Sequence, residues 1–561
     1  MHFNTFGTHL PGTKTAFMGN DMVNYFRRGT IARAMAVLVV TIPFSVDAEP
    51  IGPLDDEQRA AQAYQLRIDA AARNYAEELP EHPHNSDEAV YVDKINSYSK
   101  GLPHDANGIV DPVAYQELIS ALSSGRPSDF ENITMGEGGF LLRNPQAAYS
   151  YFMEGKDAHS YSMPAAPAFD SAWQASDAAE VMWQALTRDV PFSEYDKNTL
   201  IQAAANDLST MSDFRGPKEN SKVTPQTLFR GIAVGETVGP YISQFLLKDI
   251  PYGATTVVQK YNVPVKGNDH MTDYAEWLLI QRGGRPSGIT TVKFQPQPHY
   301  LYNGRALAQY VLQDFVNQAY LGAARIIRGF GSRAYSKNDP YANSASQARS
   351  PLFGNNHAVD WIGRVAMGSQ NVAWYQKWLV HRRARPEVFF GRLHNHLTNN
   401  AISYPIHQDL LKSAALTKVF AEHGTYLLPT ATPDGSPLHP TYPAGHAVMA
   451  GAAVTMLKAF FNGDFEIPDP VMPNKHGNAL IPYVGEKLTI EGELNKLASN
   501  ISLGRDVAGV HYRTDGDLGM ALGEEYAITI LRELVDTYNE DFAGFSFNRF
   551  DGTPVTIQKL H

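Results

Sequence analysis

The spacing of apolar and polar residues along this chain predicts one helix after another. Apolar residues recur every three or four positions in most segments, which is the period of an amphipathic α-helix. Acidic residues open the first of these segments, as is typical of a helix N-terminus. The predicted helices span residues 55–78, 170–188, 305–328, 371–383, 408–422, 445–461, 491–502 and 517–538.

Signals for β-strands are few and short. Residues 289–294 follow a glycine and begin with four consecutive β-branched residues, so they are predicted to form a hairpin arm. No repeat of fixed period is present, which excludes a solenoid. The pattern therefore predicts an all-α fold in which helices pack into bundles.

The first 48 residues are predicted to be an export signal or a disordered leader. Arg27 and Arg28 precede an apolar run over 34–46 that ends in Val46-Asp47-Ala48. The run is shorter than the roughly 20 residues that span a bilayer, so no stable membrane span is expected. We predict a periplasmic or secreted protein, with a cytoplasmic location as the alternative.

Residues 329–357 are rich in Gly, Ser, Asn and Pro, which indicates a domain boundary or a long ordered loop. They separate an N-terminal helical region, 49–328, from a C-terminal helical region, 329–561. The motifs described below all lie in the second region. We expect the two regions to form one integrated catalytic unit.

Composition narrows the possible functions. The formal net charge of -11 argues against a nucleic-acid partner, which would need a basic surface. The 43% hydrophobic and 19% charged residues are typical of a globular protein. The chain has no cysteine, which excludes disulfides, thiolate metal sites and a cysteine nucleophile.

Basic side chains are concentrated in a first motif at 377–386, of sequence KWLVHRRARP. Lys377 and Arg385 are eight residues apart, and a bend would let both project toward one region. We expect Pro386 to end or bend the helix that carries them. A solvated basic face and an anion site both fit this motif alone.

A second motif, HPTYPAGH at 439–446, leads directly into an apolar helix. Gly445 and His446 would then lie at a helix N-terminus, where free N–H groups and the helix dipole favour an oxyanion. The same residues also occur in ordinary loops, so this motif indicates an oxyanion site only in combination with the first and third motifs.

The third motif, RDVAGVH at 505–511, contains an arginine and a histidine that could converge only across a helix break. Gly509 provides a place for that break. Asp515, four residues after His511, could accept a hydrogen bond from one ring nitrogen and leave the other free for a metal or for attack on phosphorus. A purely structural role for the histidine is the alternative.

Together the motifs supply one lysine, two arginines and two histidines, which predicts an oxyanion site. The set resembles the vanadium haloperoxidases, which share their anion site with the type 2 phosphatidic-acid phosphatases and bacterial acid phosphatases. The string KWLVHR at 377–382 and His439, seven residues before His446, are similar to the algal and cyanobacterial bromoperoxidase branch. So are YSKGLPH at 98–104 and RDVPF at 188–192.

The resemblance implies a vanadate cofactor and a role for each motif residue. His511 would be the ligand of the metal, and Lys377, His439 and His446 would be catalytic, the lysine polarising peroxide and the histidines moving protons. The residues that would bind the oxygens of vanadate are Lys377, Arg385, Gly445, His446 and Arg505.

The same resemblance implies that hydrogen peroxide oxidises halide to a hypohalous species, which then halogenates small organic acceptors. His439 favours bromide and iodide, whereas Trp374 resembles the aromatic lining of chloroperoxidases and keeps chloride open. It also implies a homo-oligomer. Asp314, within an apolar helix, is expected to pair with an arginine of the site, because a buried carboxylate needs a partner.

One position departs from the family: Ala444 stands where serine usually donates to vanadate, which predicts weaker vanadate retention. Two other functions stay open. A phosphohydrolase could use the same site, with His511 as the nucleophile. A non-catalytic oxyanion-binding protein would keep the site without turnover.

Overall fold

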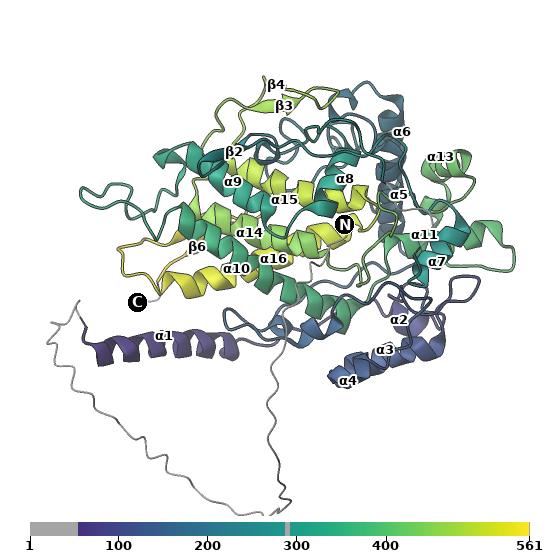
Figure 1. Cartoon of the computed structure of the whole chain (residues 1–561), viewed down its shortest axis with the longest axis horizontal. Helices are drawn as coiled ribbons and strands as arrows, with labels where there is room; N and C mark the ends of the chain where they lie inside the picture. Colours follow the sequence, from purple (N-terminus) through teal and green to yellow (C-terminus); the bar gives the residue numbers. More distant parts are fainter. Residues whose placement is uncertain (1–53, 286–291, 560–561) are drawn as a thin grey trace, which may run out of the picture. The chain divides into compact units, whose positions relative to one another are not determined.

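The computed structural model describes residues 54–285 and 292–559 (Figure 1). Residues 1–61 and residues 62–561 form separate compact units, and the packing below concerns the second. The predicted export signal lies outside the described residues and stays a prediction. Most of the predicted hairpin arm at 289–294 lies outside them too, although Phe294 pairs with Pro264 in an isolated antiparallel bridge.

Sixteen α-helices account for most of the regular structure in the described residues. The longer ones are α1 (Asp56–Ala76), α3 (Pro112–Ser124), α5 (Ala172–Thr187), α6 (Thr199–Leu208), α7 (Tyr274–Gln281), α8 (Gly304–Gln313), α9 (Gln318–Gly329), α10 (Asn355–Tyr375), α11 (Pro386–Thr398), α13 (Ala414–His423), α14 (Gly445–Phe460), α15 (Ile490–Val507) and α16 (Arg513–Val535). Single-turn helices are α2 (Asp87–Val90), α4 (Pro127–Phe130) and α12 (Gln408–Leu411).

Shorter elements connect these helices. Five are 3-10 turns: η1 (Pro145–Tyr149), η2 (Ala158–Ser160), η3 (Phe192–Glu194), η4 (Gln244–Leu246) and η5 (Ser332–Ala334). A sixth, η6 (Gln376–His381), is a π-helical segment.

The strands of the described residues form three two-stranded antiparallel sheets. β1 (Ile250–Tyr252) pairs with β2 (Thr255–Val257), β3 (Val471–Pro473) with β4 (Leu480–Pro482), and β5 (Phe545–Asn548) with β6 (Pro554–Ile557). The registers place Tyr252 opposite Thr255, Pro473 opposite Leu480 and Asn548 opposite Pro554. These small hairpins leave the all-α prediction confirmed.

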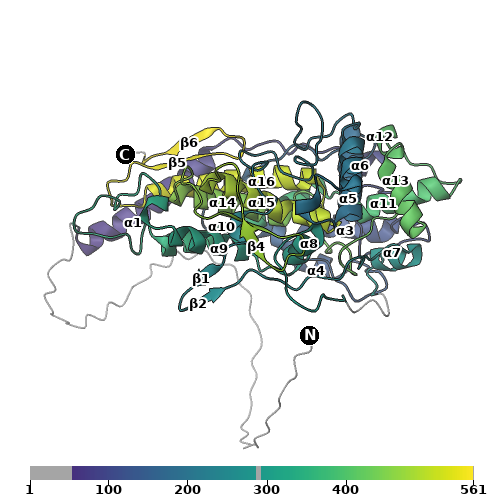
Figure 2. The same ribbon diagram turned by 90° about the horizontal axis from the view of Figure 1, so that it is seen from above.

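Helix α14 is the centre of the bundle. It is apolar around its whole circumference, and His446 is its only residue that is not buried. A helix of that kind must be covered on every side. In both views α14 lies among α10, α15 and α16 (Figures 1 and 2). The start of α14, and with it the second motif, is thereby held at a defined place between the helices that carry the first and third motifs.

The contact between α14 and α16 is close enough to require glycine on both sides. A Cβ on Gly451 would lie 2.0 Å from the carbonyl oxygen of Met520, and one on Gly523 would lie 1.9 Å from that of Val448. Both distances are far inside van der Waals contact. The backbones of the two helices therefore touch directly, which fixes their relative position.

Three helix predictions were wrong in their boundaries. The segment 305–328 is two helices that break at Asp314, whose backbone is extended. The segment 408–422 breaks between α12 and α13, where the Ser413 side chain caps the second helix. The predicted helix 371–383 is the last turn of α10, which begins at Asn355, followed by the π-helical η6. No helix in the described part of the chain is long and apolar enough to span a membrane.

Candidate active site

The first motif folds as a π-helical turn followed by a sharp break. η6 ends at His381, and Arg382 then adopts a left-handed φ of 42°. We expected Pro386 to end the helix that carries Lys377. Instead Pro386 is the first residue of α11, where its missing N–H leaves no hydrogen bond unmade. Arg385 precedes it as the N-cap, and the break brings its charge close to the Lys377 ammonium.

Lys377 is fully buried and joins the first motif to the second. Its Nζ donates to the carbonyl oxygens of Pro440 at 2.6 Å and Thr441 at 2.9 Å. Burial lowers the pKa of Lys377 well below its usual value, and the nearby Arg385 charge lowers it further. The ammonium is thus held by neutral carbonyls, so an anion placed beside it would stabilise its charge.

The second motif begins helix α14 as predicted. Ala444 is the N-cap and offers no side-chain hydrogen bond to the first turn. His446 is partly exposed, and its Nε2 lies 3.2 Å from Oδ1 of Asp314. We expected Asp314 to pair with an arginine of the site, and its hydrogen-bonded partner is this histidine instead. The break between α8 and α9 places the carboxylate there.

Arg505, near the end of α15, is buried and only partly satisfied. Its Nη1 donates to the carbonyl oxygen of Val311 at 2.8 Å, but its Nε has no hydrogen-bond partner among the described residues. Burial lowers its pKa to about 10, although the charge of Asp314 opposes that shift. A buried guanidinium N–H without a partner is costly, so Arg505 has a donor available for a ligand.

The third motif contains the break that its sequence predicts. α15 ends at Val507, Gly509 has a φ of 83°, and α16 begins two residues after His511. Nδ1 of His511 lies 3.0 Å from Oδ2 of Asp515, which confirms the expected contact. With its proton on Nδ1, the ring has its acceptor lone pair on Nε2. Burial and the charge of Arg385 lower the pKa of His511 well below its usual value.

Arg385 connects all three motifs. Its Nε donates to the carbonyl oxygen of His439 at 2.9 Å, and its Nη1 donates to that of Val510 at 2.8 Å. The same Nη1 lies 2.8 Å from Nε2 of His511, and Nη2 lies 3.0 Å from Nδ1 of His439. Burial, followed by the Arg385 charge, lowers the pKa of His439 well below its usual value. Both histidines are therefore neutral beside this guanidinium, and Nδ1 of His439 also lies 3.2 Å from the carbonyl oxygen of Pro440.

Two residues of this network were not predicted from the sequence. Arg383 Nη1 donates to Oδ1 of Asp515 at 3.0 Å, and the Thr441 hydroxyl donates to Oδ2 at 2.5 Å. The backbone N–H of Tyr512 also donates to Oδ2. Arg383 stands in a run of basic residues and Thr441 in a loop motif, so no local signal separates them from their neighbours. Together they hold Asp515 in the position from which it orients His511.

A buried ion pair supports the loop that carries His439. Nζ of Lys100 lies 2.7 Å from Oε1 of Glu387, and both side chains are fully buried. Lys100 also donates to the carbonyl oxygens of Asp434 and Ser436, and the Ser436 N–H donates to Glu387. The string at 98–104 carries the family resemblance, but its sequence does not indicate that Lys100 pairs with Glu387. The pair fixes the loop immediately before the second motif.

The cations of this site are only partly balanced by the protein, through the charges of nearby carboxylates such as Asp515 and Asp314. In the part of the chain that the structure describes, no carboxylate forms an ion pair with Lys377, Arg385 or Arg505. Each of the three has a pKa lowered first by burial. Arg385 lies 2.8 Å from Nε2 of His511, the charges of Lys377 and Arg505 also act on that ring, and the uncapped N-terminus of α14 is held nearby by the bond from Ala444 N–H to the Asp515 carbonyl oxygen. Such a site fits a small oxyanion with several oxygens to bind.

Comparison with known proteins agrees with this geometry. The vanadium-dependent bromoperoxidase of Ascophyllum nodosum is 35% identical over 531 residues, which cover 90% of this chain and 93% of that protein. The chain belongs to the vanadium-dependent bromoperoxidase family. The bromoperoxidase of Corallina officinalis is 31% identical over 601 residues, covering 90% of this chain and all of the relative.

The bromoperoxidase fold extends over nearly the whole chain. The structure of the homohexameric second vanadate-dependent bromoperoxidase of Ascophyllum nodosum aligns with a TM-score of 0.86 at 30% identity and covers 95% of both chains. A family model described as the VCPO second helical-bundle domain matches residues 364–540. That range contains the three motifs from Lys377 to His511.

Replacing Ala444 with serine is expected to tighten vanadate binding by roughly three- to tenfold, because a neutral hydrogen bond contributes about 0.5 to 1.5 kcal/mol. Position 444 is also the N-cap of α14, where serine would stabilise the helix by about 1 kcal/mol. Equilibrium dialysis measures the first effect, and urea unfolding of the vanadate-free protein measures the second. A stability gain with an unchanged dissociation constant would mean that the hydroxyl caps the helix without reaching the anion.

Proposed function

We infer that this bromoperoxidase-family chain oxidises halide with hydrogen peroxide to a hypohalous species that halogenates small organic acceptors. The single observation that carries the inference is the set of buried, unpaired cations around Nε2 of His511. We call the site formed by Lys377, Arg385, Arg505, His511 and the N-terminus of α14 the cradle. A phosphate-transfer enzyme would need the same cradle, but the relatives that match over the full length are bromoperoxidases. The chain is accordingly an enzyme with a vanadate cofactor.

The residues that would hold vanadate are the cations and the helix N-terminus around His511, and among them Arg505 keeps an Nε–H without a partner in the described residues. Nε2 of His511 would bind the metal in place of its present contact with Arg385 Nη1, and Lys377, Arg385, Arg505 and the Gly445 N–H would donate to the oxygens. When bound, vanadate supplies Lewis-acid activation of hydrogen peroxide. Several fixed, charge-assisted donors suit a trigonal oxyanion whose charge is spread over its oxygens.

Two histidines are placed for proton transfer. His446 is partly exposed and shares a hydrogen bond with Asp314, so it can exchange protons with solvent while its ring is held in place. His439 is buried and neutral beside Arg385, so the negative charge of a bound anion would have to offset burial and that cation before the ring could take up a proton. Lys377, fixed by its two carbonyl partners, would polarise peroxide.

Bromide and iodide are the proposed halides, with chloride as the alternative. His439 supports the first choice because it occupies the place that it has in the bromoperoxidase branch. Trp374 supports the second, since its ring lies against His439 with centroids 4.8 Å apart and so adds an aromatic wall to the site. Rates with the three halides under one set of conditions decide between them.

We also propose that the chain forms a homo-oligomer. The support is the solved bromoperoxidase that covers 95% of this chain and is described as homohexameric.

A paired assay tests the function directly. Protein loaded with vanadate should oxidise bromide when peroxide is added, and protein stripped of vanadate should not. Both forms should leave a phosphate monoester intact at the same pH. Ester hydrolysis by the stripped protein without bromide oxidation by the loaded protein would identify a phosphohydrolase. Vanadate binding without either activity would identify a non-catalytic oxyanion-binding protein.

A further inference from the structure

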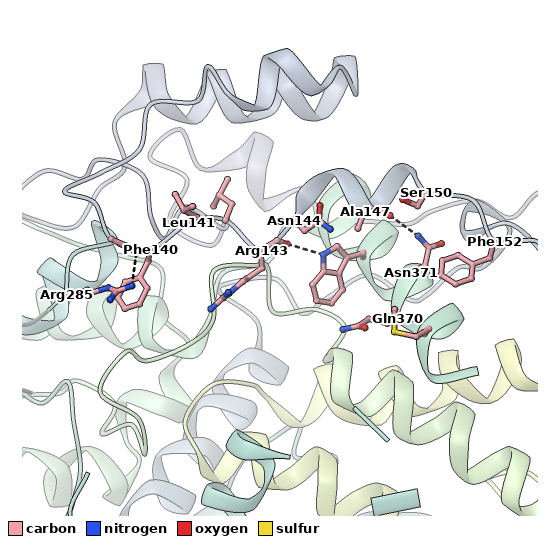
Figure 3. A pocket seen from close by; sticks show the side chains of 14 residues that line it. Phe140, Leu141, Arg143, Asn144, Ala147, Ser150, Phe152, Arg285, Gln370 and Asn371 are labelled. Carbon is pink, nitrogen blue, oxygen red and sulfur yellow. Dashed lines mark hydrogen bonds between the residues drawn. The ribbon is translucent and has the colours of Figure 1, made fainter. Parts of the chain in front are cut away.

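A pocket of about 780 Å³ opens beside the cradle, between the loop at 139–152 and helix α10 (Figure 3). Phe140 and Arg285 lie at one end, Phe152 lies at the other, and Arg143 lies between them (Figure 3). The volume is that of a small-molecule site and far exceeds what a halide ion or peroxide needs. Neither the cradle nor its supporting residues account for it.

The pocket shares a wall with the cradle. Trp374 lines the pocket, and its ring also lies against His439, with centroids 4.8 Å apart. Its indole N–H donates to the carbonyl oxygen of Arg143 at 3.1 Å, while the Arg143 N–H donates to the carbonyl oxygen of Leu438 at 2.9 Å. The backbone at Arg143 thus ties the pocket loop to the residue before His439. A molecule in the pocket would lie next to the place where the hypohalous species forms.

The lining combines apolar side chains with neutral polar ones, and it carries positive charge without negative charge. Its two ionisable residues are Arg143 and Arg285, and none of its residues is an aspartate or a glutamate, although the chain as a whole has a net charge of -11. The Arg143 guanidinium has no hydrogen bond or ion pair within the described residues. Arg285 lies over the Phe140 ring at 4.8 Å and donates to the Gly139 carbonyl oxygen. The apolar lining residues are Phe140, Leu141, Leu142, Phe152, Met367 and Trp374.

We propose that this pocket binds the organic acceptor and selects acceptors that carry a carboxylate beside an aromatic ring. The arginines would pair with the carboxylate, and the apolar side chains would pack against the ring. The proposal rests on the proposed function. In the halogenation step a ring carbon forms a bond to bromine and loses its proton, and the hydroxide of hypobromous acid leaves with that proton as water. Holding the ring nearby raises its effective concentration over that of a free solute.

A competition experiment with the vanadate-loaded protein tests the selection. Equal amounts of 4-hydroxyphenylacetate and its uncharged amide are supplied with bromide and peroxide, and the ratio of brominated acid to brominated amide is measured. Reagent hypobromous acid at the same pH gives the ratio without a pocket. The enzyme is expected to exceed that ratio at least about threefold, because a charge-assisted pair favours the acid.

Substitutions of the two arginines test whether the pocket causes the preference for the acid. The double variant Arg143→Gln and Arg285→Gln should bring the product ratio down to that of reagent hypobromous acid, while bromide-dependent consumption of peroxide stays within about twofold of wild type, since neither side chain contacts the cradle. Arg333→Gln is the matched control. Arg333 is exposed, lies outside the pocket, and has no side-chain partner in the described parts of the chain. It should change neither quantity.

A binding measurement separates this proposal from the proposed function. Calorimetry with 4-hydroxyphenylacetate, in the absence of bromide and peroxide, should show binding to wild type that weakens at least about threefold in the double variant. If the protein binds 4-hydroxyphenylacetate through the two arginines but oxidises no halide, the pocket is a binding site and the proposed function is wrong. A wild-type ratio equal to that of the reagent, or a raised ratio that the double variant keeps, would overturn the acceptor site.

Discussion

Replacing His511 with alanine is expected to abolish halide oxidation by removing the nitrogen that would bind vanadium. Partners that only orient a metal ligand change metal affinity by about 10- to 100-fold, so loss of the ligand itself should exceed about 100-fold. Equilibrium dialysis against vanadate and bromide oxidation at saturating peroxide measure the two effects. Vanadate affinity and bromide oxidation should fall together, because the remaining cations can still attract the anion but cannot hold the metal.

The control is a buried histidine outside the cradle. His104 is as buried as a core residue and makes hydrogen bonds with Ser99 and the Leu102 carbonyl oxygen. His104→Ala should lower stability while keeping vanadate affinity and specific activity. Wild-type vanadate affinity in folded His511→Ala would show that another residue binds the metal.

Replacing Asp515 with asparagine is expected to destabilise the protein by about 3 to 5 kcal/mol, because it leaves a buried arginine without its closest carboxylate. Arg383 lies 3.0 Å from Oδ1, and both side chains are almost wholly inaccessible. On the other side of the carboxylate, Oδ2 accepts from Thr441 and lies beside His511. One amide oxygen cannot serve both sides, so at least one set of donors loses its acceptor.

Urea unfolding of the vanadate-free protein measures that loss, and vanadate affinity should fall about 10- to 100-fold as His511 loses its orienting partner. Asp464→Asn is the matched control, since Asp464 pairs with Lys337 on the surface, where both side chains are mostly exposed. It should change stability by less than about 1 kcal/mol. Equal losses in the two variants would contradict the role given to the buried network.

Some helix boundaries and some contacts of the site follow from local sequence. The periodicity of α5, α14 and α16 comes close to their observed bounds, because each buries an apolar face or is buried throughout. The break at Gly509 and the contact of His511 with Asp515 were also predictable. Both depend on residues a few positions apart, where backbone geometry alone determines which side chains can meet.

Other contacts had no local signal. Asp314 was expected within one continuous helix and beside an arginine, yet the helix breaks there and its carboxylate lies beside His446. The partners of Lys377 are carbonyl oxygens more than 60 residues away, in a loop whose sequence says nothing about lysine. The apolar pocket beside Trp374 likewise joins segments that are distant along the chain.

The sequence by itself determined the helical architecture, the three motifs and the residue types of an oxyanion site. Only the tertiary structure decided how those residues share their partners: Arg385 between two histidines, Asp515 between Arg383 and Thr441, and Asp314 with His446. The physical reason is that periodicity reports which face of a segment is buried and not what covers it. Which donors stay free for an anion depends on that covering, because each buried polar group must find a partner in whatever segment packs against it.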